Sequence, residues 1–402
     1  MLSYEAARER LLAAVRELES ERVGLEDACG RVLAESVVAS SPLPPFAYSA
    51  MDGYAVATRD LGGAGPWELR VEGESRTGRP SVPLVPGAAS AISTGAEVPA
   101  GADAVLPREI VERTSDAIRF GDRVRAGQHV RHAGEDLATG AVALERGLRL
   151  GPAALGLAAS LDVTELRVAR RPRVTILCTG DELRAPGSAP ILGKIPESVS
   201  PALAALARLA GALVRRELPV ADEQGATERA IAAALVDTDV LLTVGGVSVG
   251  EHDWVRPALA TAGVTLDFWK VAIKPGKPIA FGYGAGGSPA VLGLPGNPAS
   301  ALITFSLFGM PLLRAMQGDR QPSPLPVTLP LSAPLRHKTG RLEFVRVALE
   351  RRDGRLCVLP LDNQASGALT SLAWAAGLAL VPAEVETLPE GALVEVLRAQ
   401  DL

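Results

Sequence analysis

Four acidic side chains stand in two turns that each follow a short apolar run. They are Asp181 and Glu182 in TGDEL, and Glu251 and Asp253 in GGVSVGEHD. Four carboxylates in one place repel one another unless a cation or a basic group lies among them. Mg²⁺ is usually held by a few carboxylates together with the phosphates of a substrate. We therefore expect these acids to bind a divalent cation, although an acid at the start of a helix also stabilises the helix dipole without any ligand.

The Gly-rich turns supply the complementary chemistry, which is the binding of anions. GGVSVGEHD contains Gly245, Gly246, Ser248 and Gly250, and GLPGNP follows the apolar run 290–294. Backbone N–H groups in such turns and at the starts of helices favour anions. GGVSVGEHD lacks the spacing of the dinucleotide and P-loop fingerprints, so the motif alone is equally compatible with a simple tight turn.

Two lysines, Lys274 and Lys277, flank a Pro-Gly turn in the sequence KPGKP. A stiff turn fixes the direction of both side chains, and lysine is a compact charge suited to phosphate or another oxyanion. The lysines and the acids together indicate a site for a phosphorylated substrate with a metal ion, although most lysines are merely solvated. Asp52 in MDGYAV and Asp136 in GEDLATG are equally compatible with ordinary turn or cap residues.

Strands and helices alternate between residues 170 and 317. The predicted strands include RVTILC, ALVRREL and the run 240–244, and the predicted helices include SPALAALARLAGA and ATERAIAAAL. This alternation is typical of a doubly wound, mainly parallel sheet with helices on both faces, in which ligands lie beyond the carboxyl ends of strands. TGDEL, GGVSVGEHD and LPGNP all follow strands, so we expect them to share one edge. The uncharged tract 278–313 is predicted to form buried strands and one core helix.

The remaining sequence predicts smaller domains around this sheet. Ser3 is expected to cap a helix from Glu5 to about Leu18, and a second helix over 152–161 is expected to return and pack on it. Between them lies a Gly- and Pro-rich module with short apolar runs, which predicts β structure. The fold class is therefore multidomain α/β plus β. The predicted domains are residues 1–41 plus 134–169 (helical or extended linker), 42–133 (β-rich insertion), 170–317 (α/β) and 318–402 (all-β).

Composition excludes several classes of function. Lys plus Arg is 41 and Asp plus Glu is 46, which gives a formal net charge of −5 without any basic run, so no nucleic acid is expected. Cys29, Cys178 and Cys357 are far apart, which fits a reducing compartment, and no His and Cys cluster favours zinc. The charged, amphipathic N-terminus is unlike a signal peptide. We expect a soluble, cytoplasmic protein that does not enter a membrane.

Eight motifs occur in one order along nearly the whole chain. They are SAMDGYAV, STGAEVPAGADAV, RHAGEDLATG, TGDEL, GGVSVGEHD, KPGKP, GLPGNP and SGALTSLAWAAGL. In this order the sequence resembles the molybdopterin molybdenumtransferases, the MoeA family, which includes the C-terminal domain of gephyrin. The resemblance implies an elongated homodimer of four-domain chains. It also implies insertion of molybdate into the dithiolene of adenylylated molybdopterin, with release of AMP and help from Mg²⁺ or another divalent cation.

The resemblance assigns roles to individual residues. As catalytic acids it implies Asp52, Asp136, Glu182 and Asp253. As substrate contacts it implies Thr94, Lys274, Lys277, Pro295, Pro298 and Ser366. From the Gly-rich turns we also expect substrate contacts by Gly245, Gly246, Ser248, Gly250, Gly296 and Asn297. As metal ligands we expect Asp181, Glu182, Glu251 and Asp253.

The chain departs from the family at one point. Glu197-Ser198-Val199 stands where the family usually has Asp-Ser-Asn. The missing amide suggests a lost hydrogen bond to substrate, so Val199→Asn is expected to be neutral or to improve affinity. A divergent paralog, a molybdopterin adenylyltransferase-like enzyme and a non-catalytic molybdopterin-binding scaffold remain alternatives at this stage.

The positions of the acids predict sites shared between two chains. Asp52 and Asp136 lie in or beside the insertion, whereas Glu182 and Asp253 follow strands of the sheet. If the insertion stands apart from the sheet, the partner's insertion can reach the site in a two-fold dimer. A molybdopterin adenylyltransferase and molybdoenzymes that accept the product are further expected partners.

Overall fold

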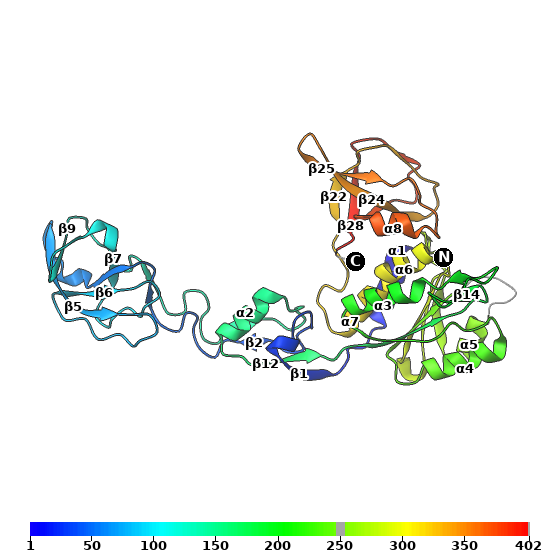
Figure 1. Cartoon of the computed structure of the whole chain (residues 1–402), viewed down its shortest axis with the longest axis horizontal. Helices are drawn as coiled ribbons and strands as arrows, with labels where there is room; N and C mark the ends of the chain where they lie inside the picture. The colour runs from blue at the N-terminus through cyan, green and yellow to red at the C-terminus, as the bar shows by residue number, and fades with distance from the viewer. Residues whose placement is uncertain (247–253, 401–402) are drawn as a thin grey trace.

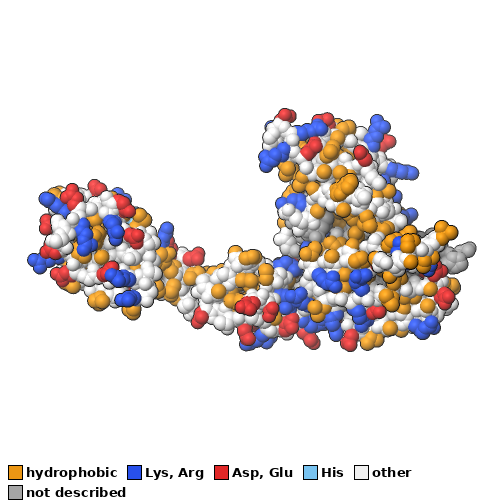
Figure 2. Space-filling view, viewed as in Figure 1, with side chains coloured by type: hydrophobic (Ala, Val, Ile, Leu, Met, Phe, Trp, Pro, Cys, Tyr) orange, Lys and Arg blue, Asp and Glu red, His pale blue; other side chains and the backbone are white. Residues whose placement is uncertain are grey.

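The computed structural model describes residues 1–246 and 254–400. The chain is elongated and folds into several compact units, which we call bodies (Figure 1). An inserted β body lies at one end, and a broad sheet body with a C-terminal body beside it lies at the other. A narrow linker body joins them, and Figure 2 shows how little of the molecule it comprises. The predicted fold class, multidomain α/β plus β, is confirmed.

The sheet body is built on a six-stranded sheet in the order β16-β13-β17-β21-β20-β18. The first four strands are parallel, and β20 and β18 extend the sheet by antiparallel pairing. The strands are β13 (Arg173–Cys178), β16 (Leu213–Arg216), β17 (Val240–Val244), β18 (Thr265–Trp269), β20 (Ala280–Tyr283) and β21 (Ala290–Leu294), with the short pair β14 (Leu183–Arg184) and β15 (Ile195–Pro196) beside them.

Helices cover both faces of this sheet because its central strands are apolar on both sides. In β13, Ile176 packs into one core and Leu177 into the other, and Leu242 and Leu241 of β17 divide in the same way. Successive residues of a strand face opposite sides, so a continuous apolar run requires two covering layers. The helices are α1 (Tyr4–Ala13), α3 (Val199–Leu209), α4 (Gln224–Ala234), α5 (Val255–Thr261), α6 (Pro298–Thr304) and α7 (Met310–Met316).

A long apolar helix crosses the interior of the sheet body. It begins at Pro298 as α6, passes through the π-helical turn η5 (Phe305–Gly309) and ends with α7 at Met316. Its length and composition would suit a membrane span, but 83% of its most apolar stretch of 18 residues is buried inside the protein. The predicted core helix is therefore confirmed.

The N-terminal helix belongs to the sheet body and not to the linker. Ser3 caps it by accepting the Ala6 N–H, as predicted. The helix ends at Ala13 instead of Leu18, because the Leu18 N–H donates to the Met316 carbonyl and the chain leaves the helix. Its buried Leu11 packs in the core under the sheet, so the expected packing against the helix 152–161 is wrong.

The linker body has a small core of its own. Here α2 (Pro152–Ser160) begins with proline in its first turn, as predicted, and buries Ala158 against residues such as Leu150 and Leu166. The linker strands are β1 (Ser20–Gly24), β2 (Val37–Val38), β11 (Val142–Leu144) and β12 (Glu165–Ala169). Strands from both sides of the insertion pair here, β1 with β12 and β2 with β11.

The inserted β body is an independent six-stranded sheet in the order β7-β4-β6-β5-β9-β8. Its core includes Tyr54, Leu106 and Phe120. The sheet strands are β4 (Gly53–Val56), β5 (Trp67–Ser75), β6 (Ala88–Ile92), β7 (Ala104–Pro107), β8 (Glu112–Arg113) and β9 (Ala117–Phe120). A separate antiparallel pair is formed by β3 (Tyr48–Ser49) and β10 (Val130–Arg131).

The C-terminal body is also mainly β, with the order β19-β24-β26-β28-β22 and β25 paired to β24. Its edge strand β19 (Ile273–Lys274) comes from the middle of the sheet body's sequence. The other strands are β22 (Val327–Pro330), β23 (Leu335–Arg336), β24 (Leu342–Arg352), β25 (Arg355–Pro360), β26 (Gly377–Val381), β27 (Thr387–Leu388) and β28 (Leu393–Arg398). One helix, α8 (Leu369–Trp374), was not predicted in this β region.

Candidate active site at the edge of the sheet

The carboxyl ends of three neighbouring parallel strands meet at one edge of the sheet body. The turns after β13, β17 and β21 emerge side by side and line a cavity of about 560 Å³. The described lining comprises Cys178, Thr179, Gly180, Glu182, Leu183, Ile195, Pro196, Glu197, Ser198, Val199, Asp222, Val244, Gly245, Gly246, Pro278, Pro295, Gly296, Asn297 and Pro298. The prediction that these turns share an edge is confirmed for the described residues.

Glycine is required where two of these turns approach each other. Gly245 has a φ of +85°, and a Cβ added there would lie 2.9 Å from the carbonyl oxygen of Thr179. A Cβ on Gly296 would lie 3.7 Å from the Cα of Gly245, so both glycine turns are in close proximity. The main chain is therefore exposed to the cavity without intervening side chains, which suits an anion.

The core helix begins at this cavity. Asn297 is the residue that precedes α6, and Pro298 occupies its first turn, where the missing N–H of proline costs nothing. Pro295 to Pro298 all line the cavity. The positive end of the helix dipole is thus directed toward the place where a negative substrate group would lie.

Acidic side chains also line the cavity. Glu182 lines the cavity, and so does Asp222, which is not among the predicted site residues. Asp181 and Asp222 lie together: the Asp222 N–H donates to Asp181 Oδ1 at 3.2 Å and the Asp181 N–H donates to Asp222 Oδ2 at 3.4 Å. Asp222 follows strand β16 and could have been found by applying the strand-end argument once more.

The donors suit a hard cation, because Asp181, Glu182 and Asp222 offer only carboxylate oxygens. Within residues 1–246 and 254–400, however, no group of three His, Cys, Asp or Glu side chains converges on one point. The described acids therefore fit Mg²⁺ in chemistry but need ligands from elsewhere. Ser248, Gly250 and the predicted ligands Glu251 and Asp253 lie outside the described residues.

The two predicted lysines lie differently from each other. The Lys277 side chain is exposed, next to the cavity-lining Pro278. Lys274 Nζ instead forms an ion pair at 2.9 Å with Glu343 of the C-terminal body. Lys274 is not among the cavity-lining residues.

The C-terminal body also contacts the start of the core helix. The carbonyl oxygen of Ser366 accepts the N–H of Ser300 in the first turn of α6, at 3.2 Å. The motif around Ser366 is therefore brought beside the turn LPGNP, although the two are far apart in sequence.

The segment that departs from the family has a structural role. Glu197 is buried and accepts the backbone N–H groups of Val199 and Ser200, each at 2.7 Å, at the start of α3. Burial, and then the neighbouring Glu197, raise the pKa of the Cys178 thiol well above its usual range. The Val199 side chain is only 6% exposed and belongs to the main core. Val199 also lines the cavity, so it has a packing role in the core, and the expected recognition role of this position stays a prediction.

Comparisons with known proteins find matches over nearly the full chain. Residues 2–161 match the MoeA N-terminal region (domain I and II), residues 175–315 match a probable molybdopterin binding domain, and residues 328–398 match the MoeA C-terminal region (domain IV). Molybdopterin molybdenumtransferase 2 of Mycobacterium tuberculosis is 38% identical over 383 residues, which covers 93% of this chain and 94% of that protein. The chain belongs to the MoeA family.

Other MoeA relatives cover the chain equally well. The molybdopterin molybdenumtransferase of Synechococcus elongatus is 38% identical over 98% of this chain and 99% of its own. A crystal structure of the molybdopterin biosynthesis MoeA protein from Pyrococcus horikoshii OT3 superposes with a TM-score of 0.85 at 29% identity, covering 98% of this chain and 99% of that one. The predicted family and enzyme class, a molybdopterin molybdenumtransferase of molybdenum cofactor biosynthesis, are confirmed.

The remaining predicted residues of this MoeA chain lie in or beside the inserted β body, away from the cavity (Figure 1). Asp52 Oδ1 accepts the backbone N–H of Thr94 at 2.7 Å and its hydroxyl at 3.0 Å. These two hydrogen bonds hold the pKa of the Asp52 carboxyl below its usual value, in spite of a small opposing effect of desolvation. Asp136 is exposed in the segment that returns to the linker. One chain therefore does not bring Asp52, Thr94 or Asp136 to the sheet edge.

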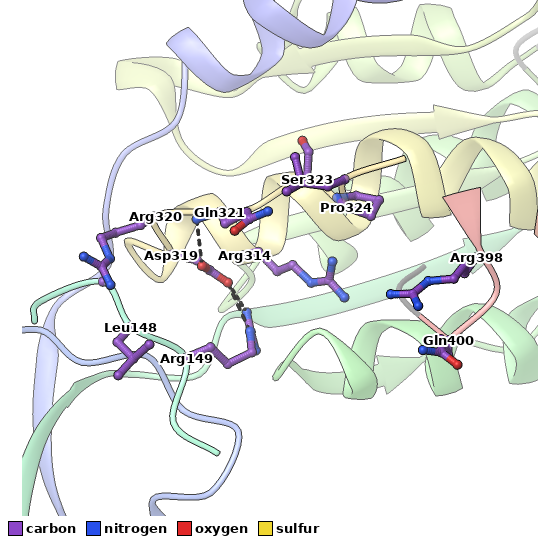
Figure 3. Close-up of a pocket in the computed structure, with 12 residues that line it drawn as sticks. Leu148, Arg149, Arg314, Asp319, Arg320, Gln321, Ser323, Pro324, Arg398 and Gln400 are labelled. Carbon is purple, nitrogen blue, oxygen red and sulfur yellow. Dashed lines mark hydrogen bonds and ion pairs between the residues drawn. The ribbon is translucent and has the colours of Figure 1, made fainter. Parts of the chain in front are cut away.

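A second cavity, of about 800 Å³, lies at the junction of the linker, sheet and C-terminal bodies (Figure 3). Arg149 of the linker donates to Asp319 from Nε at 3.0 Å and from Nη2 at 2.9 Å. None of the predicted site residues lines this cavity. This cavity is the larger of the two, but it has neither the glycine turns nor the strand ends of the site. Its ion pair joins two bodies of the molecule.

Proposed function

We propose that this chain inserts molybdate into the dithiolene of adenylylated molybdopterin and releases AMP. The observation that supports this most directly is the cavity lined by Gly245, Gly296 and the start of α6 together with the acids Glu182 and Asp222. Molybdate and the phosphates of the pterin are anions, so main-chain N–H groups and a helix N-terminus suit them. The acids then accept or position protons and water in the hydrolysis that releases AMP.

Individual roles are proposed from the cavity lining and from the matching motifs of the family. Gly245, Gly246 and residues 295–298, with Ser248 and Gly250, are proposed to hold the substrate's phosphates. Lys274 and Lys277 are proposed to attract the oxyanion, and Ser366 to approach it from the C-terminal body. Glu182 at the cavity and Asp253 are proposed as catalytic acids. Mg²⁺ would be held by Asp181, Glu182, Glu251 and Asp253 together with substrate phosphates, and would neutralise charge between them.

The complete site is proposed to need two chains. Asp52, Thr94 and Asp136 are separated from the cavity by the linker body (Figure 1). A two-fold dimer would bring the partner's insertion to each cavity and make every contact twice. The surface of α2 supports such a contact. This helix is apolar or small in every residue except its last, yet only Ala158 is buried, and apolar side chains gather over it in Figure 2.

We propose the cytoplasm as the compartment. The three cysteines are unpaired: Cys178 and Cys357 are buried and Cys29 is exposed. A molybdopterin adenylyltransferase that supplies the substrate, and molybdoenzymes that accept the product, are proposed as partners.

The test is a single incubation of purified protein with adenylylated molybdopterin, molybdate and Mg²⁺. Release of AMP that depends on molybdate is the expected result. Formation of adenylylated pterin from ATP and molybdopterin would instead assign adenylyltransferase activity. Tight pterin binding without either reaction would assign a scaffold role. In the same assay, removal of Mg²⁺ by a chelator is expected to slow AMP release, and an unchanged rate would remove the metal from the proposal.

A further inference from the structure

The strand that carries Lys274 is shared between two bodies. Its sequence belongs to the sheet body, but β19 pairs in parallel with β24 of the C-terminal body. In this register Ile273 is opposite Leu342 and Lys274 is opposite Glu343. The Arg341 guanidinium adds a further hydrogen bond between the two bodies, because it donates to the Ile273 carbonyl at 3.2 Å. The direction of the lysine is therefore set by the sheet of the C-terminal body.

Glu343 lies between the lysine and a buried histidine. Its Oε1 is 2.9 Å from Lys274 Nζ, and its Oε2 is 2.6 Å from His337 Nδ1. The side chains of Glu343 and His337 are 7% and 0% exposed, whereas that of Lys274 is 40% exposed. The buried Glu343 carboxylate thus holds the Lys274 ammonium, which remains partly open to solvent.

This arrangement is poorly explained by stability alone. His337 Nε2 is buried and finds no hydrogen-bond partner in the described part of the chain. An unsatisfied buried polar atom costs free energy, and an apolar residue of similar size would avoid that cost. What His337 does provide is a fixed contact to Oε2, which leaves Oε1 of Glu343 directed at the lysine.

We propose that Glu343, held by His337, is a positioning residue that fixes the Lys274 ammonium for the oxyanion substrate. This inference rests on the proposed role of Lys274 at the site. Because Lys274 and Glu343 lie on paired strands, any movement of the C-terminal body against the sheet body also moves the ammonium. The C-terminal body therefore takes part in substrate binding through a residue that does not itself touch substrate.

The sign of the effect on KM separates this role from a simple charge effect. Glu343→Gln removes a negative charge near an anion site, so electrostatics alone predicts tighter molybdate binding and a lower KM. A positioning role predicts the opposite, because the lysine is no longer held. We expect the KM for molybdate to rise roughly tenfold, the size of one lost hydrogen bond to a charged group, with kcat changed much less.

Matched variants complete the test. His337→Asn keeps a donor near Nδ1 and is expected to preserve KM, whereas His337→Leu is expected to raise it as Glu343→Gln does. Glu350→Gln is the control, since Glu350 lies on the same strand and pairs with Arg352 at 3.0 Å, and it should change nothing. Melting curves of all variants report folding, and Glu343→Asp serves if Glu343→Gln does not fold.

A double-mutant cycle identifies the residue through which Glu343 acts. In a Lys274→Met background, Glu343→Gln is expected to have no further effect on KM. Additive effects, or a lower KM for Glu343→Gln alone, would overturn the inference. If Lys274→Met itself leaves KM unchanged, the proposed role of the lysine fails instead, and the two failures are thereby distinguished.

Discussion

The inserted β body and the sheet body hold their polar residues in opposite ways. In the sheet body, the ends of parallel strands bring glycine turns, acids and a helix start around one cavity. In the inserted β body, Asp52 and Thr94 form an exposed pair on a small sheet whose core is entirely separate. One body thus encloses a site, and the other presents groups outward. The difference is consistent with the proposal that the inserted body contributes its acids to the site of a partner chain.

A mixed dimer gives the largest expected effect and tests this comparison directly. Asp52→Ala and Glu182→Ala are each expected to lower AMP release by about 100-fold or more, the range seen when a catalytic acid is lost. In a dimer of one chain of each kind, a shared site would combine both lesions in one site and leave the other intact. Activity should then return to about half of wild type.

The mixed dimer of wild type with Asp52→Ala is the control for subunit exchange and should also retain about half of the activity. If the dimer of Asp52→Ala with Glu182→Ala is as inactive as its parents, each site is built within one chain. The contrast between the two bodies would then lose its functional meaning.

Replacement of a turn glycine tests the enclosed site by itself. Gly245→Ala places a Cβ 2.9 Å from the Thr179 carbonyl at a φ of +85°. Strain of this kind costs about 1–3 kcal/mol, so both the urea midpoint of the sheet body and substrate binding should fall. Gly296→Ala is the matched control for stability alone, because its Cβ meets only an ordinary contact at 3.7 Å. Equal stability of the two variants would contradict the described turn.

Val199→Asn has a smaller expected effect and distinguishes packing from recognition. An amide in the core without a partner costs about 1–3 kcal/mol, so the melting temperature should fall and pterin affinity should not improve. Val199→Ala removes the same methyl groups without adding a polar atom and serves as control. Tighter pterin binding by Val199→Asn at an unchanged melting temperature would support the recognition hypothesis instead.

The smallest effect is expected at the exposed pair of the inserted β body. Thr94 lowers the pKa of Asp52, so the pair contributes stability above the pKa of the unfolded chain and loses it as the pH falls through the lower folded pKa. Thr94→Val removes the hydroxyl donor and should move the Asp52 pKa upward, toward its usual value, as measured by NMR titration of the carboxyl carbon. The backbone N–H of residue 94 remains, so the Asp52 pKa should return only part of the way to its usual value. An unmoved pKa would show that this hydroxyl has no influence.

Much of the sheet body could be predicted because local patterns there agree with the tertiary fold. The runs 240–244 and 290–294 are strands with those bounds, since a continuous apolar run bounded by glycine or proline has few alternatives in a parallel sheet. The shared edge followed from the rule for strand ends. The start of the first helix was predicted from Ser3, but its end was not, because a hydrogen bond from Leu18 to the distant Met316 decides it.

Sequence alone thus determined the family, the kinds of side chain at the site and the strands that carry them, because these depend on residue types and on short-range periodicity. Only the tertiary structure decided which groups meet. It paired Lys274 with Glu343 and His337, buried Val199 in the core and separated Asp52 from the cavity. Such contacts join segments distant in the chain, and they depend on strand pairing and body arrangement, which no local pattern records.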